Sequence, residues 1–265
     1  MSKAPYTVET LLRGLNILSL FTRDNPALSL TEISIATGLN KTTIFRFVST
    51  LEDSGFLFRN PETKKYRPGV KVLQLGFSAL ASLELRQIAR PYLEQLSQRV
   101  GLTVSLSILD QMEIIYIDRV RNQQIVGVLL GLGSRLPAHC TSMGKAMLAH
   151  LPIEELLKRV EAAELIPRTS KSVVDRASLD NELARVRHQG YAINDEEVEI
   201  GLRAVAAPIW DNTGRVVAAT NITGSVAMIS RESLVGELAQ AVRQTAVQIS
   251  QALGYPNVSI DVAVR

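Results

Sequence analysis

One stretch constrains the fold of this chain more than any other, and it runs from residue 28 to residue 59. Ser29 followed by Glu32 has the S-x-x-E spacing of a capping box, which predicts the start of a short helix. Gly38 ends that helix, because glycine readily adopts the backbone of a sharp turn. Asn40 is a favoured N-cap residue and predicts the start of a second helix. The stretch therefore predicts two short helices joined by a tight turn.

The second helix has two different sides. Ile44, Phe47, Val48 and Leu51 recur at helical spacing and predict a buried face. Polar and basic residues gather near the amino end on the opposite side, which is typical of a helix-turn-helix recognition helix in a DNA major groove. The alternative is an ordinary helical hairpin with a solvated basic face. The candidate DNA-binding residues of the two helices are Ser29, Thr31, Asn40, Lys41, Thr42, Thr43 and Arg46.

A short β-hairpin is predicted after the second helix. Gly55 ends the helix, residues 56–58 predict a strand, and residues 59–65 form a turn-rich run. Tyr66 then begins a return strand. Such a hairpin predicts a wing that lies along a phosphate backbone. Its candidate DNA-binding residues are Arg59, Lys64 and Lys65.

The charge distribution agrees with a DNA-binding N-terminal segment. Residues 1–70 contain nine Lys or Arg and six Asp or Glu, and the net charge of the whole 265-residue chain is also +3. The rest of the chain is therefore balanced. The positive surplus lies in the winged segment, where a DNA footprint requires it.

Composition limits the other possibilities. A chain of 265 residues with 46% hydrophobic residues predicts two domains. No apolar run is long enough for a membrane span, and the first residues lack the apolar core of a signal peptide. Cys140 is the single cysteine, which excludes an internal disulfide. We therefore expect a cytoplasmic protein that has no membrane partner.

The remaining patterns predict an α/β (α+β) chain with an antiparallel sheet. Pro91 lies inside a helical pattern and predicts a break or kink there. The domains expected are a winged helix-turn-helix at 8–69, a linker helix at 70–85 and a second domain at 86–254. The predicted helices are 8–21, 70–85, 85–100, 153–163, one that ends at residue 189, and 233–253; the predicted strands are 103–108, 114–120, 125–130, 191–193, 203–210 and 215–222.

A loop rich in small and hydroxyl residues runs into a helix that is predicted to start near Ser142. The N–H groups of residues 144–146 at such a start suit a carboxylate, with help from the helix dipole. The alternative is a capped helix without a ligand. His139 and Cys140 could suggest a base and a nucleophile, but adjacent side chains tend to point apart and no orienting partner can be named.

Other enzyme signals are weak. The run from Asn194 to Glu199 carries four carboxylates, yet no histidine lies near it, so a solvated acidic loop is favoured over a metal site. Gly127, Gly131 and Gly133 lack the spacing of a dinucleotide-binding fingerprint, and no G-x-S-x-G is present. We expect no enzyme, no metal and no cofactor.

Several motifs follow one another in order along the chain: residues 12–18, 30–56, Tyr66 followed by 73–76, 136–149, 188–197 and 201–224. Together they resemble the motifs of IclR-type transcriptional regulators, over residues 8–254. The resemblance implies a winged helix-turn-helix, a linker helix, a GAF-like effector-binding domain, and homodimers or homotetramers that bind pseudo-palindromic double-stranded DNA operators. The residues of some motifs are similar to those of the branch that regulates β-ketoadipate and aromatic-acid catabolism.

The resemblance also implies where an effector binds. Ala204 departs from the usual cysteine and Asn221 from the usual serine, which favours a roomier acid than glyoxylate or pyruvate. The expected function is a DNA-binding regulator modulated by a small organic acid, aromatic or dicarboxylic. The alternatives are a metabolic enzyme built on the C-terminal domain and a ligand-independent DNA-binding protein. The expected effector-binding residues are Ser142, Gly144, Lys145, Ala146, Asn194, Ala204, Asn221 and Thr223.

Overall fold

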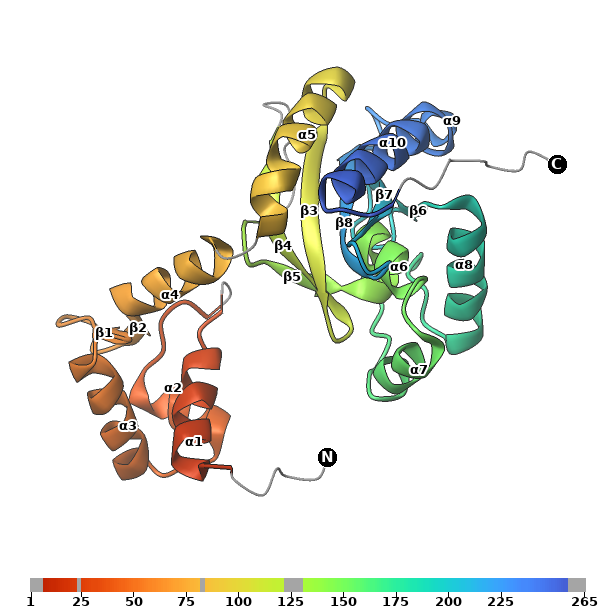
Figure 1. Ribbon diagram of the computed structural model, residues 1–265. Helices are drawn as coiled ribbons and strands as arrows, with labels where there is room; N and C mark the ends of the chain where they lie inside the picture. The colour runs from red at the N-terminus through yellow and green to blue at the C-terminus, as the bar shows by residue number, and fades with distance from the viewer. Residues whose placement is uncertain (1–6, 23–24, 82–83, 122–130, 257–265) are drawn as a thin grey trace. The chain divides into compact units, whose positions relative to one another are not determined.

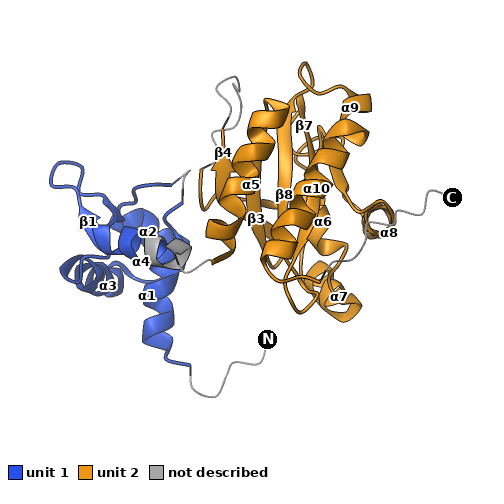
Figure 2. Cartoon of the chain, turned by 45° about the horizontal axis from the view of Figure 1, so that its top comes forward, with its two compact units in different colours: residues 1–82 blue, residues 83–265 orange. Residues whose placement is uncertain are grey.

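The computed structural model describes residues 7–22, 25–81, 84–121 and 131–256. The chain divides into an N-terminal unit, Met1–Ser82, and a C-terminal unit, Leu83–Arg265 (Figure 2). Each unit has its own buried core. The boundary falls inside the predicted linker, 70–85.

The N-terminal unit is the predicted winged helix-turn-helix. Its core consists of buried residues that the helices and the wing contribute: Ile17, Ile33, Ile44, Val48, Leu57 and Tyr66. The wing strands pair antiparallel, with Arg59 opposite Tyr66. The elements are α1 (Glu9–Ser19), α2 (Leu30–Thr37), α3 (Lys41–Asp53), β1 (Leu57–Arg59), β2 (Tyr66–Pro68) and α4 (Val70–Ala81).

The two predicted helix caps are confirmed. Ser29 and Glu32 form a reciprocal capping box at α2, and Asn40 Oδ1 accepts from the Thr43 N–H at α3 over 2.8 Å. Gly38 ends α2 in the left-handed region, with φ of 70°. The turn between α2 and α3 therefore follows from local residue chemistry.

The predicted linker, 70–85, takes in α4 and the first residues of the next helix. α4 is described to Ala81 and the next helix from Glu84, and residues 82–83 lie outside the described residues. Gly69 joins the wing to α4 at a very close backbone approach, where an added Cβ would overlap Gly55 O. The Gly69 N–H donates to Phe56 O over 2.8 Å at the same place.

The C-terminal unit is built on an antiparallel sheet of six strands in the order β5-β4-β3-β8-β7-β6. This agrees with the predicted α+β class (Figure 1). The strands are β3 (Thr103–Asp110), β4 (Glu113–Val120), β5 (Arg135–Pro137), β6 (Ala192–Asp195), β7 (Leu202–Trp210) and β8 (Val216–Ser225). The helices are α5 (Glu84–Val100), α6 (Ser142–Leu148), α7 (Ile153–Glu161), α8 (Arg176–Gln189), α9 (Arg231–Val235) and α10 (Glu237–Ala252), with a 3-10 turn η1 (Ala138–Cys140).

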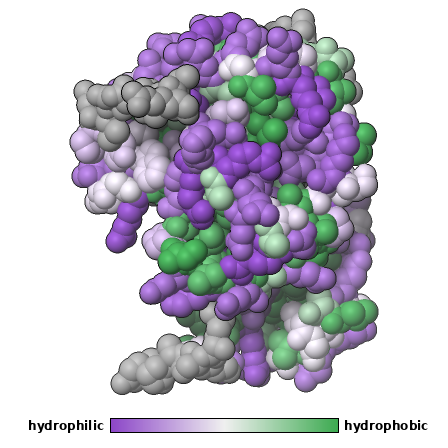
Figure 3. Space-filling model, turned by 90° about the vertical axis from the view of Figure 1, so that its right-hand side faces the viewer, coloured by the Kyte–Doolittle hydropathy of each residue, from purple (hydrophilic) through white to green (hydrophobic). Residues whose placement is uncertain are grey.

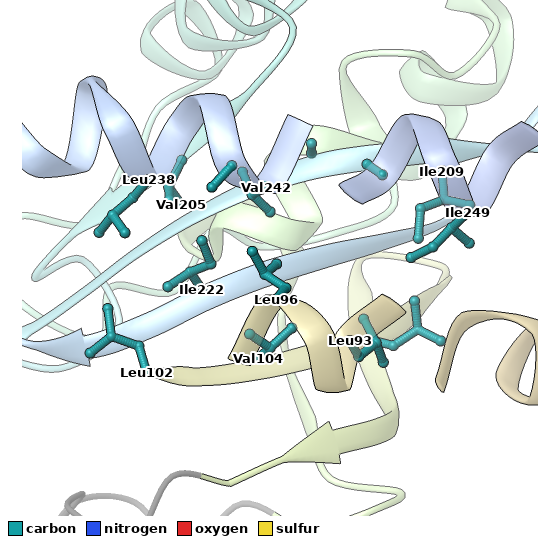
Figure 4. Close-up of a cluster of buried hydrophobic side chains, with 14 of the residues drawn as sticks. Leu93, Leu96, Leu102, Val104, Val205, Ile209, Ile222, Leu238, Val242 and Ile249 are labelled. Atoms are coloured by element: carbon teal, nitrogen blue, oxygen red, sulfur yellow. The ribbon is translucent and has the colours of Figure 1, made fainter. Parts of the chain in front are cut away.

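Helices cover both faces of this sheet. α5 and α10 pack on one face, where Leu93 and Leu96 meet Val242 and the strand residues Val104 and Ile222 (Figure 4). α6, α7 and α8 contribute to a second core on the other face. Because strand side chains alternate between faces, β4, β6, β7 and β8 each supply residues to both cores.

Two predicted elements need correction, and one strand was missed. α5 runs through Pro91 without a break, because Ala89, Leu93 and Leu96 hold the helix against the sheet. The predicted final helix is interrupted at Gly236, whose backbone is not helical, which separates α9 from α10. β5 was not predicted, and the predicted strand at 125–130 lies outside the described residues.

No helix within the described ranges combines the length and hydropathy that crossing a membrane requires. The face shown in Figure 3 is largely hydrophilic, with apolar residues in small separate groups. Such scattered exposed apolar groups are ordinary for a protein surface in water.

Candidate functional site

The recognition helix α3 has a buried side and an exposed side. Ile44 and Val48 are fully buried in the N-terminal core. Lys41, Thr42 and Arg46 are exposed, as the sequence predicted for residues that contact DNA. The apolar residues therefore leave the basic and hydroxyl groups of α3 turned to the solvent.

Phe45 is exposed on the same side of α3 and was missed from the sequence. Its side chain is 51% exposed, although phenylalanine is usually buried. It lies three and four residues from Thr42 and Lys41, which places it among them on a helix. The sequence held a signal for Phe45, because this aromatic residue lies outside the predicted buried face of the helix and among its polar residues.

Two other candidate side chains have structural roles. Ser29 Oγ accepts from the Glu32 N–H over 3.2 Å, and Asn40 Oδ1 is engaged by Thr43. These side chains shape the helix starts, whereas Thr31 is exposed and engaged in neither cap. The N–H of Thr43 is the group that Asn40 caps, and its side chain is half-buried.

The wing presents its basic residues unequally. Lys64 is exposed at the turn with φ of 58°, whereas Lys65 Nζ lies 3.3 Å from Glu32 Oε1. Hydrogen bonds from Ser29, together with Lys65, lower the pKa of Glu32 to about 2, so this carboxylate is ionised near neutral pH. The Arg59 guanidinium lies 5.7 Å from the Tyr66 ring centroid. Lys64 is thus the wing candidate that is most open to a phosphate.

A partly enclosed cavity of about 50 Å³ lies in the C-terminal unit, on the α6 face of the sheet. All six strands of the sheet and the start of α6 contribute to its lining, which therefore comes from segments far apart in the chain. The lining residues are Ser105, Tyr116, Arg119, Leu136, Thr141, Ser142, Met143, Arg168, Asn194, Val198, Leu202, Ala204, Asn221 and Thr223.

The structure brings five of the eight predicted effector residues together around this cavity: Ser142, Asn194, Ala204, Asn221 and Thr223. The prediction of free N–H groups at residues 144–146 is wrong. The Gly144 N–H donates to Thr141 Oγ1 over 3.1 Å, and the Lys145 N–H donates to Thr141 O over 2.9 Å. Ala146 lies one residue further into α6, beyond the Lys145 N–H bond that begins the helical ladder.

The three misplaced residues have packing roles among the described residues. An added Cβ on Gly144 would overlap the backbone of Ala138, so glycine allows η1 to approach α6. Ala146 is fully buried in the second core. Lys145 is 1% exposed, and its Nζ lies 2.6 Å from Glu197 Oε1 and 3.4 Å from Glu182 Oε1.

The predicted solvated acidic loop is instead a network of paired carboxylates. Glu197 is 8% exposed, and burial raises the pKa of its carboxyl, although Lys145 acts in the opposite direction. Lys171 Nζ lies 2.5 Å from Glu196 Oε1, and Arg203 Nε lies 2.7 Å from Asp195 Oδ1. The cations come from distant parts of the sequence, so the acidic run alone did not reveal them.

Two asparagines present defined polar groups at the cavity. Asn194 Oδ1 accepts from the Glu197 N–H over 2.8 Å. Asn221 Nδ2 donates to Thr223 Oγ1 over 2.8 Å, while Asn221 Oδ1 is buried without a partner among the described residues. As predicted, Asn221 and Thr223 lie on the same side of β8.

Cationic and phenolic residues of the cavity were not predicted. Arg119 is half-buried on β4, and its burial lowers the pKa of the guanidinium. Burial raises the pKa of Tyr116 to about 12, so its hydroxyl stays protonated near neutral pH. Arg168 approaches from the exposed loop after α7. A charged residue inside a predicted strand was the signal for Arg119, and nothing in the local sequence indicates Arg168.

Cys140 and His139, the two residues that could suggest catalysis, are not arranged as a nucleophile and base. Cys140 is fully buried, and burial raises the pKa of its thiol to about 11. His139 Nε2 lies 3.2 Å from Ile166 O rather than against that thiol. Within the described ranges, no group of three or more His, Cys, Asp or Glu residues could hold a metal ion.

A basic recognition helix and wing, followed by a sheet domain with a small, mostly apolar cavity that carries a few polar groups, define a DNA-binding transcriptional regulator with an effector-binding domain. Comparison with family models agrees. Residues 10–61 match the IclR helix-turn-helix domain, and residues 77–251 match the C-terminal domain of bacterial transcriptional regulator IclR. The chain belongs to the IclR family.

Three similar proteins illustrate the relationship. The HTH-type transcriptional regulator XynR of Escherichia coli is 35% identical over 249 residues, which cover 94% of this chain and 98% of XynR. The Pca regulon regulatory protein of Pseudomonas putida is 34% identical over 231 residues, which cover 87% and 79% of the two chains. The crystal structure of an IclR homologue complexed with 4-hydroxybenzoate, from Microbacterium hydrocarbonoxydans, has a TM-score of 0.78 and 28% identity, and the match covers 92% and 98%. Two differently named regulators are thus about equally similar to this chain.

Proposed function

We propose that this protein regulates transcription by binding a pseudo-palindromic operator, and that a small organic acid changes its affinity for that operator. The observation that carries the proposal is the combination of an exposed basic face on α3 with a cavity in the C-terminal unit whose lining includes two arginines and two asparagines. A regulator that acts on DNA works in the cytoplasm of a bacterium. The proposed division is DNA-binding at 8–69, linker at 70–85 and effector-binding at 86–254.

In the proposed DNA complex, α3 lies in the major groove and the wing lies on a phosphate backbone. Lys41, Thr42 and Arg46 reach the bases and nearby phosphates, and Lys64 contacts the backbone. Phe45 suits the methyl group of a thymine, which an apolar side chain can recognise in the major groove. All five side chains are exposed.

Two substitutions test this docking. Arg46→Ala should weaken specific operator binding by about 1–3 kcal/mol if Arg46 contacts a base. Lys64→Ala should weaken binding to all sequences. It should also reduce the slope of log affinity against log salt concentration by about one, as expected for the loss of one phosphate contact. Arg99→Ala, at an exposed arginine of the C-terminal unit, is the matched control. Unchanged operator binding in both test variants, with folding intact, would contradict the docking.

The proposed assembly is a homodimer, because one recognition helix reads only a few base pairs and two-fold operators require two. Helix α1 is the proposed contact, since Leu11 is 62% exposed and Leu15 is 51% exposed. Leu11→Asp should shift the protein toward monomer in sedimentation experiments. A wild-type monomer at micromolar concentration, with or without operator, would refute the proposal, and a tetramer would show that a second surface also associates.

The proposed effector site is the cavity on the α6 face. Guanidinium groups bind carboxylates with charge-assisted hydrogen bonds, so Arg119 and Arg168 replace the helix start as the proposed carboxylate partners. Arg119→Gln should weaken binding of every acid, measured by calorimetry, by roughly tenfold or more. An Arg119→Gln variant with wild-type affinity would show that the carboxylate binds elsewhere.

Two observations bear on the class of acid, and they favour acids of different size. The relative solved with 4-hydroxybenzoate supports an aromatic acid. The cavity volume of about 50 Å³ favours a shorter acid, because a protein cavity that holds benzene has about 150 Å³. A benzoate would therefore require lining side chains to move, and the exposed Arg168 is the one least restrained by packing.

We propose that no catalysis is involved, and the buried Cys140 and its separation from His139 support this. Incubation with a bound acid should therefore return the acid unchanged. Operator binding that is identical with and without every acid tested would favour the ligand-independent alternative.

A further inference from the structure

The amide group of Asn221 is unusual among the polar groups of the cavity. The residue is 3% exposed, and its Nδ2 is used by Thr223. Its Oδ1 is buried and has no partner in the part of the chain that the structure describes. Buried amide oxygens are nearly always hydrogen-bonded, because leaving one unpaired is unfavourable. This oxygen therefore marks a place where a ligand supplies a hydrogen-bond donor.

The sheet register places a cation at a defined distance from this oxygen. Arg119 pairs with Ser105 across β4 and β3, and Ser105 pairs with Asn221 across β3 and β8. Neighbouring strands lie about 4.8 Å apart, so the backbones of Arg119 and Asn221 are separated by about 10 Å. The small side chain of Ser105 lies between them and leaves space above the sheet. A short molecule can therefore meet both side chains at once.

Asn194 offers the cavity a hydrogen-bond donor, in contrast to the acceptor oxygen of Asn221. A backbone N–H can only donate, so the Glu197 N–H fixes the oxygen end of the Asn194 amide. Its Nδ2, which only donates, is then the end available to the cavity. Asn194 and the arginines thus suit acceptor oxygens, whereas Asn221 Oδ1 requires a donor.

We propose that the effector is a hydroxy carboxylic acid whose carboxylate meets Arg119 and whose hydroxyl donates to Asn221 Oδ1. The inference rests on the proposed effector site and adds the chemical class of its ligand. An acid without the hydroxyl leaves Oδ1 unpaired. An oxo acid or an ionised dicarboxylate places an acceptor against an acceptor, because a ketone and a carboxylate have no donor. The expected order of affinity is hydroxy acid, unsubstituted acid, then oxo acid and dicarboxylate.

Calorimetry on the full-length protein tests this order with matched sets of acids. One set is propanoate, 2-hydroxypropanoate, 3-hydroxypropanoate, 2-oxopropanoate and propanedioate. The other is benzoate, 4-hydroxybenzoate, 4-formylbenzoate and benzene-1,4-dicarboxylate. A hydroxy acid should bind at least about tenfold more tightly than its unsubstituted and oxo partners, since that ratio corresponds to one buried unpaired group.

Asn221→Leu removes the acceptor while keeping a similar volume. The affinity ratio between the hydroxy acid and its unsubstituted partner should fall to near one, because the variant has no amide oxygen to distinguish the two acids. Thr245→Val is the control, because it removes a buried hydroxyl from α10 away from the cavity and should leave the ratio unchanged.

The outcomes separate the two proposals. If acids bind but a hydroxy acid has no advantage, the inference is overturned and the effector site stands. Tighter binding of an oxo acid would mean that Asn221 turns its nitrogen into the cavity, which also overturns the inference. If no acid binds the unaltered protein, both proposals fail. The comparison of ligands decides the matter even if Asn221→Leu does not fold.

Discussion

Replacing Lys145 with methionine should destabilise the C-terminal unit severely. Lys145 is 1% exposed, and its Nζ neutralises Glu197 at 2.6 Å and Glu182 at 3.4 Å. Methionine preserves most of the apolar stem but leaves the buried Glu197 carboxylate without its nearest cation. Removing one partner of a buried ion pair costs about 3–5 kcal/mol of the free energy of unfolding. We expect a loss in that range near neutral pH.

The single tryptophan provides a selective assay. Trp210 lies on β7, so its fluorescence reports the unfolding of the C-terminal unit and not that of the winged unit. For a unit of this size, the expected loss lowers the melting temperature by roughly 6–20 °C. Lys158→Met is the control, because Lys158 is exposed on α7 and its removal should change stability by less than about 0.5 kcal/mol.

The pH dependence of the stability loss shows whether the unpaired Glu197 carboxylate causes it. The ordinary pKa of the Glu197 carboxyl is 4.5, and burial raises it in the folded protein. A raised carboxyl pKa gives stability that is present below 4.5 and lost as pH rises through the folded value. Removing Lys145 raises that pKa further, so the loss in Lys145→Met should shrink as the pH falls toward 4.5. Adding Glu197→Gln should restore much of the stability at neutral pH. A loss below about 1 kcal/mol, or one that neither low pH nor Glu197→Gln relieves, would refute the reasoning.

Three further substitutions test other parts of the structure. Phe45→Ala should weaken operator binding without changing its salt dependence, because no charge is removed; a gel-shift titration over salt concentration measures both. Gly69→Ala should lower the free energy of unfolding of the N-terminal unit by about 1–3 kcal/mol through overlap with Gly55 O, whereas Gly76→Ala, which has open space around its Cα, should not, as circular dichroism can show. Burial, aided by Arg187, lowers the pKa of His150 from 6.5 to about 4, so stability should fall as pH drops from 6.5 toward 4. His150→Gln should flatten this slope in thermal melts, and an unchanged slope would assign the dependence to other groups.

The helix-turn-helix could be predicted from the sequence because its determinants are local. The capping box at Ser29, the turn at Gly38 and the cap at Asn40 each act within a few residues. Side chains that bond within four positions can be inferred from spacing alone. The recognition helix was predicted correctly for that reason, including its buried face at Ile44 and Val48.

The cavity could be predicted only in part, because its partners are distant in sequence. β3 pairs with β8, which brings Ser105 beside Asn221 across more than a hundred residues, and no local pattern encodes that register. The prediction at the start of α6 failed for a different reason. The hydroxyl of Thr141 bonds back to the Gly144 N–H, and spacing does not show whether such a hydroxyl faces a ligand or its own helix.

The alternation along β8 has a consequence for how such proteins diverge. Ile222 points into the core beneath α5 and α10, whereas its neighbours Asn221 and Thr223 line the cavity on the other face. A mutation at either neighbour can alter what the cavity accepts without removing an atom from that core. Gene duplicates of such a chain can therefore acquire new chemical signals by single substitutions while the fold is inherited unchanged.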